Sequence, residues 1–332
     1  MGVSRVAVDP RKLQSIAVIN GLVDANQPGC SAAVEIDGSI VWAAARGLAN
    51  LATGEKITTQ TRFDIASISK QFTATAILQL EREGKLSLND TIAQYVPGLP
   101  AWGKTITLSA LMHHTSRIPD FWVPLSHVGI GFSSPASQAD VVAAIRRLPR
   151  LDPGSGYEYS NSNYVLLAEV VRVVSGMALP DYLNEHIFTP LKLDMVLDPV
   201  LTAPDVALSY DDNNKLVVAG WDVFGPTGIH TTSSELAIWG DQYRQSTIVL
   251  ADFATDAADA NDPAEPRVYG AGIGILADGS LRSDGRWGGT TSTLQISADR
   301  HTSIVVMCAG HLAPRFPLAD QLWSVWIGPQ GD

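Results

Sequence analysis

The stretch that decides the fold runs Phe63-Asp-Ile-Ala-Ser67-Ile-Ser-Lys70-Gln-Phe-Thr-Ala-Thr-Ala-Ile-Leu-Gln-Leu-Glu-Arg-Glu-Gly84. Its apolar residues recur at helical spacing and Gly84 is a natural terminator, so the pattern predicts a helix over 67–84. Ser67 and Lys70 are three positions apart, which places them on one face where this helix begins. The two side chains are therefore expected to meet.

A serine hydroxyl is a poor nucleophile until an adjacent base activates it, and Lys70 can be that base for Ser67. The start of a helix adds free N–H groups and partial positive charge at the same place. A structural interpretation competes with this one, because Ser67 can also be a helix N-cap and Lys70 a solvated residue of the first turn. The four residues alone do not decide between them.

Outward from this helix, strands are predicted near both ends of the chain and helices in the middle. The segments 31–37 and 40–46 flank a hairpin signal, Asp37-Gly38, and 270–277, 291–296 and 303–307 are short and rich in β-branched residues. Further helices are predicted at 10–26, 108–114, 138–147, 162–175, 179–187, 234–242 and 317–327.

This order of elements predicts an α+β fold, an α/β sandwich. An antiparallel sheet is built from both chain ends, the terminal helices cover one of its faces, and a mostly helical region is inserted. We expect a single catalytic unit over 1–332, with sheet regions at about 10–75 and 265–330 and a helical region at about 76–264.

Composition limits the classes of function. The 332 residues are 45% hydrophobic and 17% charged, which is typical of a globular chain with a large core. A net charge of -11 without a basic run argues against nucleic-acid binding. No stretch has the length of an apolar membrane span, and residues 1–10 lack the regions of a signal peptide. We therefore expect a cytoplasmic protein, with an already trimmed secreted form as the alternative.

The chain has only two cysteines, Cys30 and Cys308, each at one end of an apolar run. Both are interpreted as small buried strand residues, and no disulfide framework is predicted. His113 and His114 are adjacent, so they point to opposite sides of a helix, and no carboxylate–histidine cluster accompanies them. No metal site is predicted, and His114 is interpreted as structural.

Two further segments carry chemistry. Tyr159-Ser-Asn161 follows a Pro-Gly turn at 153–154. A tyrosine near a lysine can share its proton, and an asparagine can anchor a substrate carbonyl or the lysine. The segment 281–290 contains three glycines before a strand, which lets a backbone approach a ligand closely. A turn tyrosine, an asparagine cap and a plain hairpin turn are the structural alternatives.

The order Ser-x-x-Lys, Tyr-x-Asn and glycine-rich motif resembles the serine β-lactamase and penicillin-binding-protein superfamily. It is most similar to the group of class C β-lactamases, D-Ala-D-Ala carboxypeptidases and related esterases. The segments 84–90, 106–116 and 227–239 also resemble this group, and the resemblance extends over about 10–327.

The resemblance implies a role for each motif residue. Ser67 would be the acyl-accepting nucleophile, while Lys70 and Tyr159 would share the general-base work and then protonate the leaving group. Asn161 would orient the substrate or Lys70, and the backbone N–H groups of Ser67 and Arg286 would form the oxyanion hole. Neither a metal nor an organic cofactor is implied.

The chain departs from the family pattern at two positions. Ser283 stands where the family has lysine or histidine, and Asp284 beside it adds negative charge, which favours neutral esters, lactones or amides over substrates with a carboxylate. Arg282 or Arg286 would restore positive charge if either reached inward. Arg117 replaces the usual glycine of a tight turn and is expected to be exposed.

The full set of expected substrate-binding residues is Asn161, Ser283, Asp284, Gly285, Arg286, Trp287 and Trp122, the two tryptophans as pocket walls.

Three functions remain open. The leading hypothesis is a serine hydrolase or acyltransferase that forms an acyl-enzyme at Ser67 with a small-molecule ester, lactone or amide. A D-amino-acid peptidase or β-lactamase is the second, and a non-hydrolytic binding or sensing relative of the fold is the third. Covalent labelling of Ser67 separates the enzymes from the binding protein. The oligomeric state is not predicted.

Overall fold

The computed structural model describes residues 9–127, 129–150, 156–244, 248, 253–254, 257–259, 267–311 and 313–328. Its centre is an eight-stranded antiparallel sheet with the order β12-β13-β14-β15-β16-β17-β1-β2. The strands are β1 (Cys30–Ile36), β2 (Ser39–Arg46), β12 (Ala258–Asp259), β13 (Arg267–Tyr269), β14 (Gly274–Leu276), β15 (Leu281–Trp287), β16 (Thr290–Ile296) and β17 (Thr302–Cys308). Because β1 pairs with β17, both chain ends build one sheet, which confirms the predicted fold class.

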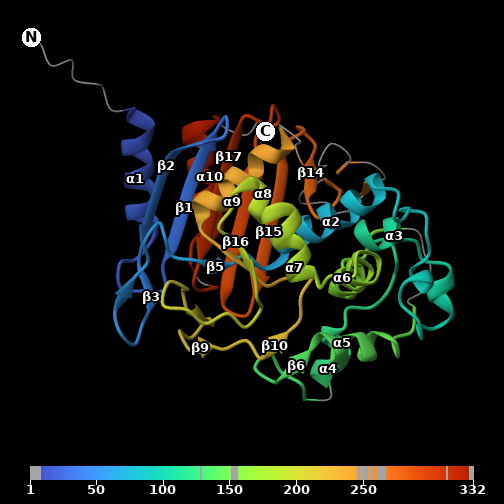
Figure 1. Cartoon of the computed structure of the whole chain (residues 1–332). Helices are drawn as coiled ribbons and strands as arrows, with labels where there is room; N and C mark the ends of the chain where they lie inside the picture. Colours follow the sequence, from blue (N-terminus) through green and yellow to red (C-terminus); the bar gives the residue numbers. More distant parts are fainter. Residues whose placement is uncertain are drawn as a thin grey trace, which may run out of the picture.

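Alternation along β1 and β17 gives the sheet two apolar faces. Ala32, Val34 and Val306 pack on one face against α1 (Pro10–Leu22) and α10 (Arg315–Trp326). On the other face lie α9 (Ser233–Gly240), which contacts β1 and β17, and α2 (Lys70–Arg82). Helices therefore cover both faces, and Figure 1 shows α1 at the edge of the molecule beside β2.

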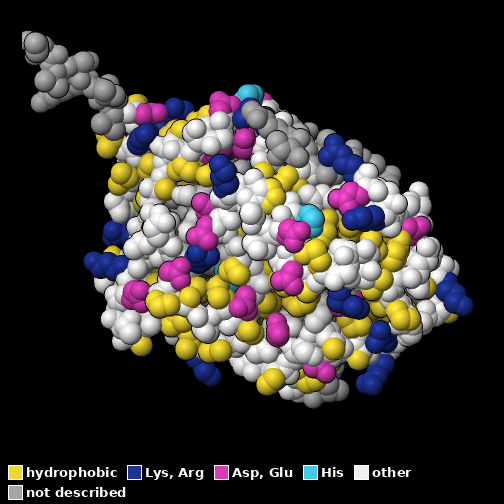
Figure 2. All heavy atoms as spheres, in the orientation of Figure 1, with side chains coloured by type: hydrophobic (Ala, Val, Ile, Leu, Met, Phe, Trp, Pro, Cys, Tyr) yellow, Lys and Arg dark blue, Asp and Glu magenta, His cyan; other side chains and the backbone are white. Residues whose placement is uncertain are grey.

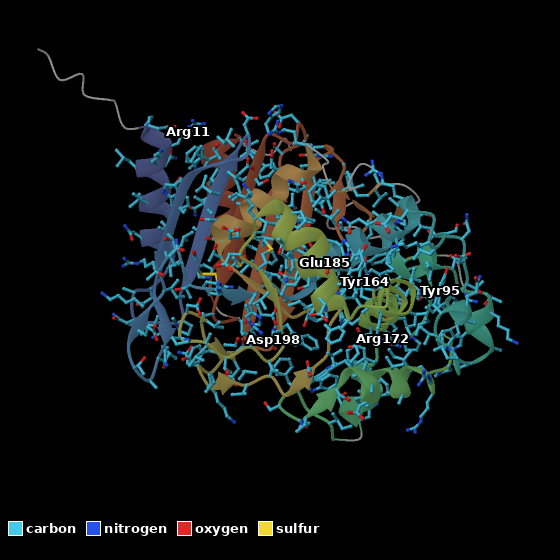
Figure 3. All side chains as sticks on the ribbon, in the orientation of Figure 1. Arg11, Tyr95, Tyr164, Arg172, Glu185 and Asp198 are labelled. Carbon is cyan, nitrogen blue, oxygen red and sulfur yellow. A yellow bond between two sulfur atoms is a disulfide. The ribbon has the colours of Figure 1, made fainter. Side chains whose placement is uncertain are left out.

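Cys30 and Cys308 are buried strand residues, as predicted, but they form a disulfide, so the expectation of no disulfide was wrong. They lie directly opposite each other in the β1–β17 pair, with 4.1 Å between their Cα atoms. Their sequence separation is 278 residues, and nothing local in the sequence indicates which strands of the two chain ends pair. The bond between the two sulfur atoms is visible in Figure 3.

The other elements lie between β2 and β12. The helices are η1 (Ala66–Ser69), η2 (Ile92–Gln94), η3 (Ala101–Lys104), α3 (Leu108–Met112), α4 (Trp122–His127), α5 (Gln138–Ile145), α6 (Asn161–Ser175), α7 (Leu179–Leu183), the π-helical turn η4 (Asn184–Phe188), α8 (Thr189–Leu191) and η5 (Asp241–Tyr243). The short strands are β3 (Leu48–Asn50), β4 (Glu55–Lys56), β5 (Phe63–Asp64), β6 (Ala136–Ser137), β7 (Val196–Leu197), β8 (Ser209–Tyr210), β9 (Leu216–Val217), β10 (Trp221–Asp222) and β11 (Ile229–Thr231). Within the described segments, no single helix is long and apolar enough to span a membrane; only α6 taken with 179–191, bent by 74°, passes the same test.

Several predicted elements differ at their ends. The helix predicted over 67–84 begins as the 3-10 turn η1, and the α-helix starts at Lys70. The helix predicted over 10–26 ends at Leu22, because Val23 has an extended backbone. The strand predicted over 270–277 is interrupted, because Gly272 has a φ of 81° and lies against the backbone of α2. The first and the third of these differences lie next to Ser67.

Candidate active site

Ser67 lies in η1, directly after the short strand β5. Ala66 before it has a φ of 50°, a left-handed conformation that is unfavourable for residues other than glycine. Asp64 holds this turn, because its Oδ1 accepts hydrogen bonds from the backbone N–H groups of Ala66 (2.7 Å) and Gly228 (3.3 Å). The position of Ser67 is therefore fixed from β5 and from the loop before β11. Burial raises the pKa of Asp64.

The structure brings Ser67, Lys70 and Tyr159 together, as the motifs predicted. Lys70 Nζ donates a hydrogen bond to Ser67 Oγ at 3.0 Å, and Tyr159 OH donates one to the same oxygen at 2.7 Å. Lys70 Nζ also lies 4.9 Å from the ring centroid of Tyr159. A proton can thus pass between Ser67 Oγ and either Lys70 Nζ or Tyr159 OH without a large movement.

Lys70 is fully buried and has only neutral hydrogen-bond acceptors around it. Besides Ser67, its Nζ donates to Asn161 Oδ1 at 2.8 Å and to the carbonyl oxygen of Pro226 at 3.1 Å. Burial lowers the pKa of Lys70 to about 7, while the negative charge of Asp120 acts in the opposite direction. A substantial fraction of the amine is unprotonated near neutral pH and can accept a proton.

Asn161 is oriented by a residue that sequence reasoning missed. Asp120 Oδ2 accepts hydrogen bonds from the backbone N–H of Asn161 at 2.9 Å and from its Nδ2 at 2.8 Å. This leaves Asn161 Oδ1 pointing at Lys70. The other oxygen of Asp120 accepts from the N–H of Trp122 at 3.0 Å, so locally the residue has the pattern of an ordinary cap of α4. Its second role, orienting Asn161, depends on a contact between segments far apart in the sequence.

The glycine-rich motif forms β15, which lies against η1. A Cβ atom at Gly285 would clash with the carbonyl oxygen of Ile65 and with Ser292 Oγ, so glycine allows this close approach. Ser292 Oγ donates to the same carbonyl oxygen of Ile65 at 2.8 Å. In the described part of the chain, β14 pairs with β15 only at Leu281 and Arg282. The backbone of 283–287 therefore has an open edge next to the serine turn.

Neither arginine beside Ser283 supplies positive charge at Ser67. Arg282 forms an ion pair with Asp284 (Nε to Oδ2, 3.1 Å) and stacks 4.8 Å from the ring centroid of Phe316. Arg286 is exposed, with Nη2 3.1 Å from His311 Nδ1. Among the described residues that line the cavity at Ser67, Ser283 is accompanied by Asp284 and by no lysine or arginine.

A cavity of about 80 Å³ opens at Ser67. It is lined by Ser67, Tyr157, Tyr159, Tyr269, Ser283 and Asp284. Tyr269 was not predicted, because it ends β13 far along the chain and no motif marks it. Trp122 and Trp287 lie outside this cavity, with 6.1 Å between their ring centroids. They form a separate aromatic cluster together with Phe132 and Trp221.

His114 packs against the tyrosine rings that surround Ser67. It is fully buried, its Nδ1 lies 3.2 Å from the N–H of Ser160, and its ring lies 4.5 Å from that of Tyr159. Burial keeps its pKa well below the usual value, so the ring is neutral. Tyr164, labelled in Figure 3, packs on the same ring. Within the described ranges, no group of three or more His, Cys, Asp and Glu side chains could hold a metal ion.

Arg117 adopts the left-handed backbone for which the family uses glycine, with a φ of 61°. Its side chain is 23% exposed and pairs with Glu158 (Nη1 to Oε2, 3.1 Å), so the expectation of an exposed arginine was wrong. The turn keeps its shape at the cost of an unfavourable conformation. The Pro-Gly turn at 153–154 lies outside the described residues.

The Beta-lactamase family model matches residues 16–323, so the chain belongs to the Beta-lactamase family, and the resemblance seen in the motifs is confirmed. Penicillin-binding protein 4* of Bacillus subtilis is 32% identical over 155 residues, which are 46% of this chain and 34% of that protein. The chain spans less than half the length of such curated relatives.

Two solved structures share the fold. A D-stereospecific amidohydrolase from Streptomyces sp. aligns with a TM-score of 0.79 and 20% identity over 96% of this chain and 99% of that one. EstCE1, described as a hydrolase with promiscuous acyltransferase activity, aligns with a TM-score of 0.79 and 17% identity over 95% and 100%. At such identities the likeness concerns the fold alone.

Proposed function

We propose that this protein is a serine hydrolase or acyltransferase that forms an acyl-enzyme at Ser67 with small neutral esters, lactones or amides. The observation that carries the proposal is the contact of one hydroxyl with two proton-transfer groups, Lys70 Nζ at 3.0 Å and Tyr159 OH at 2.7 Å. A helix cap needs neither partner. A fully buried lysine without an acidic hydrogen-bond partner is also hard to explain as a structural feature.

Acylation follows from these contacts. The neutral amine of Lys70 takes the proton of Ser67, and Oγ attacks the substrate carbonyl carbon while the carbonyl becomes an oxyanion. The backbone N–H groups of Ser67 and Arg286 stabilise that oxyanion. When the carbonyl re-forms, the bond to the leaving alcohol or amine breaks. Tyr159 OH protonates the leaving group and recovers its proton from Lys70.

Deacylation uses the same residues in the reverse direction. A water molecule, or a second alcohol in acyl transfer, gives its proton to the neutral amine of Lys70 and attacks the acyl carbon. Ser67 Oγ leaves and is reprotonated, which restores the starting state. Asn161 keeps Lys70 in place throughout, because Asp120 fixes its amide group.

The chemistry of the cavity supports neutral substrates. Of the described residues that line the space at Ser67, none is cationic, and Asp284 contributes a carboxylate. A substrate carboxylate at this end would lack a partner and meet like charge. This disfavours substrates of the β-lactam and D-Ala-D-Ala type relative to neutral esters and amides.

The test is turnover of a panel of p-nitrophenyl esters, simple carboxamides and a chromogenic cephalosporin, compared between the wild type, Ser67→Ala and the matched control Ser324→Ala. Ser324 is exposed on α10, outside the cavity at Ser67. The proposal expects ester turnover that Ser67→Ala lowers by roughly a thousandfold or more and Ser324→Ala leaves unchanged. Equal turnover in all three proteins would rule out Ser67 as the nucleophile.

A further inference from the structure

The peptide unit between Gly285 and Arg286 carries the second N–H group of the proposed oxyanion hole. Gly285 of β15 lies directly opposite Ser292 of β16. A single nitrogen, Nη1 of Arg315, donates hydrogen bonds to the carbonyl oxygens of both residues, at 2.5 Å for Gly285 and 3.1 Å for Ser292. Because two opposite carbonyl groups share one donor, they point towards each other, into the space between the two strands.

The direction of the Gly285 carbonyl group fixes the direction of the Arg286 N–H group. The peptide bond between them is trans, so its C=O and N–H bonds point in opposite directions. With the carbonyl turned to β16, the N–H of Arg286 is turned to the other side of β15, where β14 pairs only at Leu281 and Arg282. The N–H group therefore points out of the open edge of the strand, where a substrate oxygen can accept from it.

The Gly285–Ser292 pair is held from both faces of the sheet. On the face towards η1, Ser292 Oγ donates to the carbonyl oxygen of Ile65, and Gly285 has no room for a Cβ atom. On the opposite face, Arg315 begins α10, which packs against β16 and β17 (Figure 1). The arginine is partly buried, with its guanidinium carbon 3.9 Å from the ring centroid of Phe316. Its place against the strand pair is thus fixed by packing as well as by hydrogen bonds.

Arg315 brings a positive charge to this backbone from behind the strand. Burial lowers its pKa and the negative charge of Asp284 acts in the opposite direction, but a guanidinium group stays protonated in proteins. On the face drawn in Figure 2, Lys and Arg side chains lie scattered among Asp and Glu side chains, so no positive patch gathers there. Of the described residues that line the cavity at Ser67, none is a lysine or an arginine. The charge of Arg315 therefore acts through the backbone, not from the wall of the substrate cavity.

We propose that Arg315 is a positioning residue of the oxyanion hole, which fixes and polarises the Gly285–Arg286 peptide so that the N–H of Arg286 becomes a stronger donor. This inference rests on the proposed function at Ser67. A charged donor on the carbonyl oxygen draws electron density from the amide nitrogen, and linked hydrogen bonds strengthen one another. The gain is largest when the substrate carbonyl becomes an oxyanion, so Arg315 acts on the rate of acylation and not on substrate binding.

Substitution of Arg315 tests the inference. Arg315→Met keeps an unbranched side chain beside Phe316 but removes the charge and the donor. Loss of a whole oxyanion-hole donor costs about a hundredfold or more, so loss of its polarisation should lower the rate constant for acylation of Ser67 by p-nitrophenyl acetate roughly tenfold. The ester concentration at half-saturation should change by less than about twofold. Arg315→Lys, which restores a charge and a donor, should recover part of the rate. An effect confined to the half-saturation value would overturn the inference.

Arg300→Met is the matched control. Nη1 of Arg300 also donates to backbone carbonyl oxygens, those of Gly279, Ser297 and Ala298, at 2.7, 2.9 and 3.1 Å. These residues lie just before β15 and just after β16, at the end of the strand pair away from the oxyanion hole. The control variant loses the same kind of contact and should be destabilised towards urea, yet acylate at the wild-type rate. Equal loss of acylation in the two methionine variants would show that lost stability is the cause.

A pair of ketones measures the hydrogen bond to the oxyanion at equilibrium. Ser67 Oγ adds to the carbonyl carbon of trifluoromethyl butyl ketone and gives its proton to Lys70, so that the ketone oxygen becomes an anion in the oxyanion hole. Methyl butyl ketone has a similar shape and binds without addition. We expect Arg315→Met to weaken inhibition by the fluorinated ketone about tenfold and inhibition by methyl butyl ketone less than about twofold. Equal effects on both ketones would mean that Arg315 only shapes the cavity.

The acylation rates also separate failure of the inference from failure of the proposed function. Acylation that is as fast in Ser67→Ala as in the wild type contradicts the function itself, and the inference falls with it. Acylation that depends on Ser67 but is unchanged in Arg315→Met leaves the function standing and overturns the inference. If Arg315→Met does not fold, Arg315→Gln, which keeps a neutral donor, replaces it in both experiments. A wild-type rate in that variant would equally refute the role of the charge.

Discussion

Lys70 sets the pH dependence of the proposed reaction. Burial lowers its pKa to about 7, and the reaction needs its neutral form, so activity should be low below this pH and rise as the pH increases through about 7. Asp120 stabilises the charged form of Lys70. Asp120→Asn should therefore move the midpoint of kcat/KM against pH to lower pH. It should also lower kcat, because asparagine has one acceptor oxygen where Asp120 uses two, one for Asn161 and one for the N–H of Trp122. A midpoint that is unchanged or moves upward contradicts this role of Asp120.

Ser283 explains the predicted preference for neutral substrates. Ser283→Lys would place an ammonium group in the cavity at Ser67, where the wild type has Asp284 and no cation among the lining residues. We expect kcat/KM for a substrate with a carboxylate on its leaving group to rise by about tenfold relative to its neutral analogue. The measurement compares both substrates in wild type and Ser283→Lys. An unchanged ratio would mean that this position does not contact the substrate.

The motif residues could be predicted from the sequence because their relations are local. Ser67 and Lys70 are one turn apart, and Tyr159 and Asn161 flank the start of one helix. Asp64 and Asp120 act through backbone groups that the fold brings to them from other segments. Tyr269 reaches the cavity from β13, and no short pattern announces such a contact. The sequence therefore predicted which motif residues meet at Ser67, but not the residues that position them.

At the scale of elements, the predictions were accurate where a local sequence pattern or a turn signal determines the structure. The hairpin at Asp37-Gly38 joins β1 and β2, and the strands predicted over 291–296 and 303–307 correspond to β16 and β17. They were less accurate where packing overrides propensity. The turn that contains Ser67 is 3-10 rather than α-helical, and Gly272 interrupts the predicted strand to pass close to α2. Both deviations border the proposed active site.

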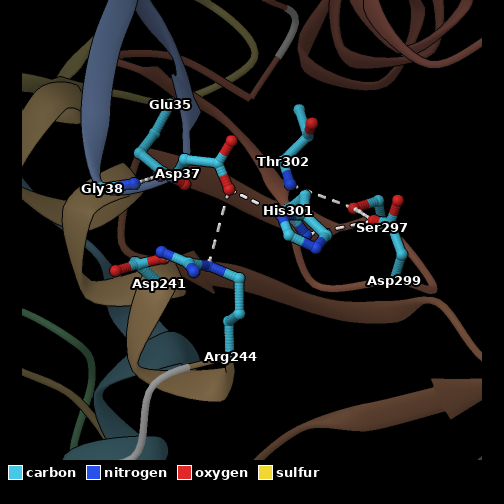
Figure 4. A network of polar contacts seen from close by, with 9 residues as sticks. All are labelled: Glu35, Asp37, Gly38, Asp241, Arg244, Ser297, Asp299, His301 and Thr302. Carbon is cyan, nitrogen blue, oxygen red and sulfur yellow. Dashed lines mark hydrogen bonds and ion pairs between the residues drawn. The ribbon is translucent and has the colours of Figure 1, made fainter.

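A polar network connects three turns at one end of the sheet, as Figure 4 shows. Glu35 of β1 accepts a hydrogen bond from the N–H of Gly38, and Asp37 lies 2.5 Å from His301 Nδ1 and 3.8 Å from Arg244 Nε. Arg244 also pairs with Asp241 at 2.7 Å. The network joins the β1–β2 and β16–β17 turns to the chain after α9.

Glu35 makes this network sensitive to pH. Burial raises its pKa from 4.5 to about 7, so the folded state favours the protonated carboxyl, and the stability this provides is lost as the pH rises through about 7. We expect Glu35→Gln to raise the free energy of unfolding by roughly 2 kcal/mol near pH 8.5 and by little near pH 5. Urea unfolding of both proteins at both pH values measures this. An equal effect at the two pH values would show that ionisation is not the cause.

At the scale of the whole molecule, the disulfide joins the two parts of the chain that build the sheet. Cys30 and Cys308 close a loop of nearly the whole chain, with a sequence separation of 278. Restricting so long a loop in the unfolded state should stabilise the fold by about 2–4 kcal/mol. Urea unfolding with and without dithiothreitol tests this, and the double variant Cys30→Ala, Cys308→Ala is the control in which dithiothreitol should change nothing. Identical wild-type curves under both conditions would contradict a stabilising bridge.

The same bond bears on where the protein works. The sequence led to the expectation of a cytoplasmic protein, but persistent disulfides are rare in reducing compartments. We infer that the chain functions in an oxidising environment. Alkylation and intact mass of the protein taken directly from its native cells should show both cysteines protected. Two alkylated thiols would place it in a reducing compartment instead.

The proposed function rests on acylation of Ser67, a step that Lys70 and Tyr159 drive. The most direct measurement is rapid-quench mass spectrometry of the wild type, Lys70→Ala and Tyr159→Phe with p-nitrophenyl acetate, followed by peptide mapping of the adduct. We predict one acetyl group on the peptide that contains Ser67, formed fastest in the wild type, more slowly in Tyr159→Phe and very slowly in Lys70→Ala. An adduct on another residue, or equal rates in all three proteins, would contradict it.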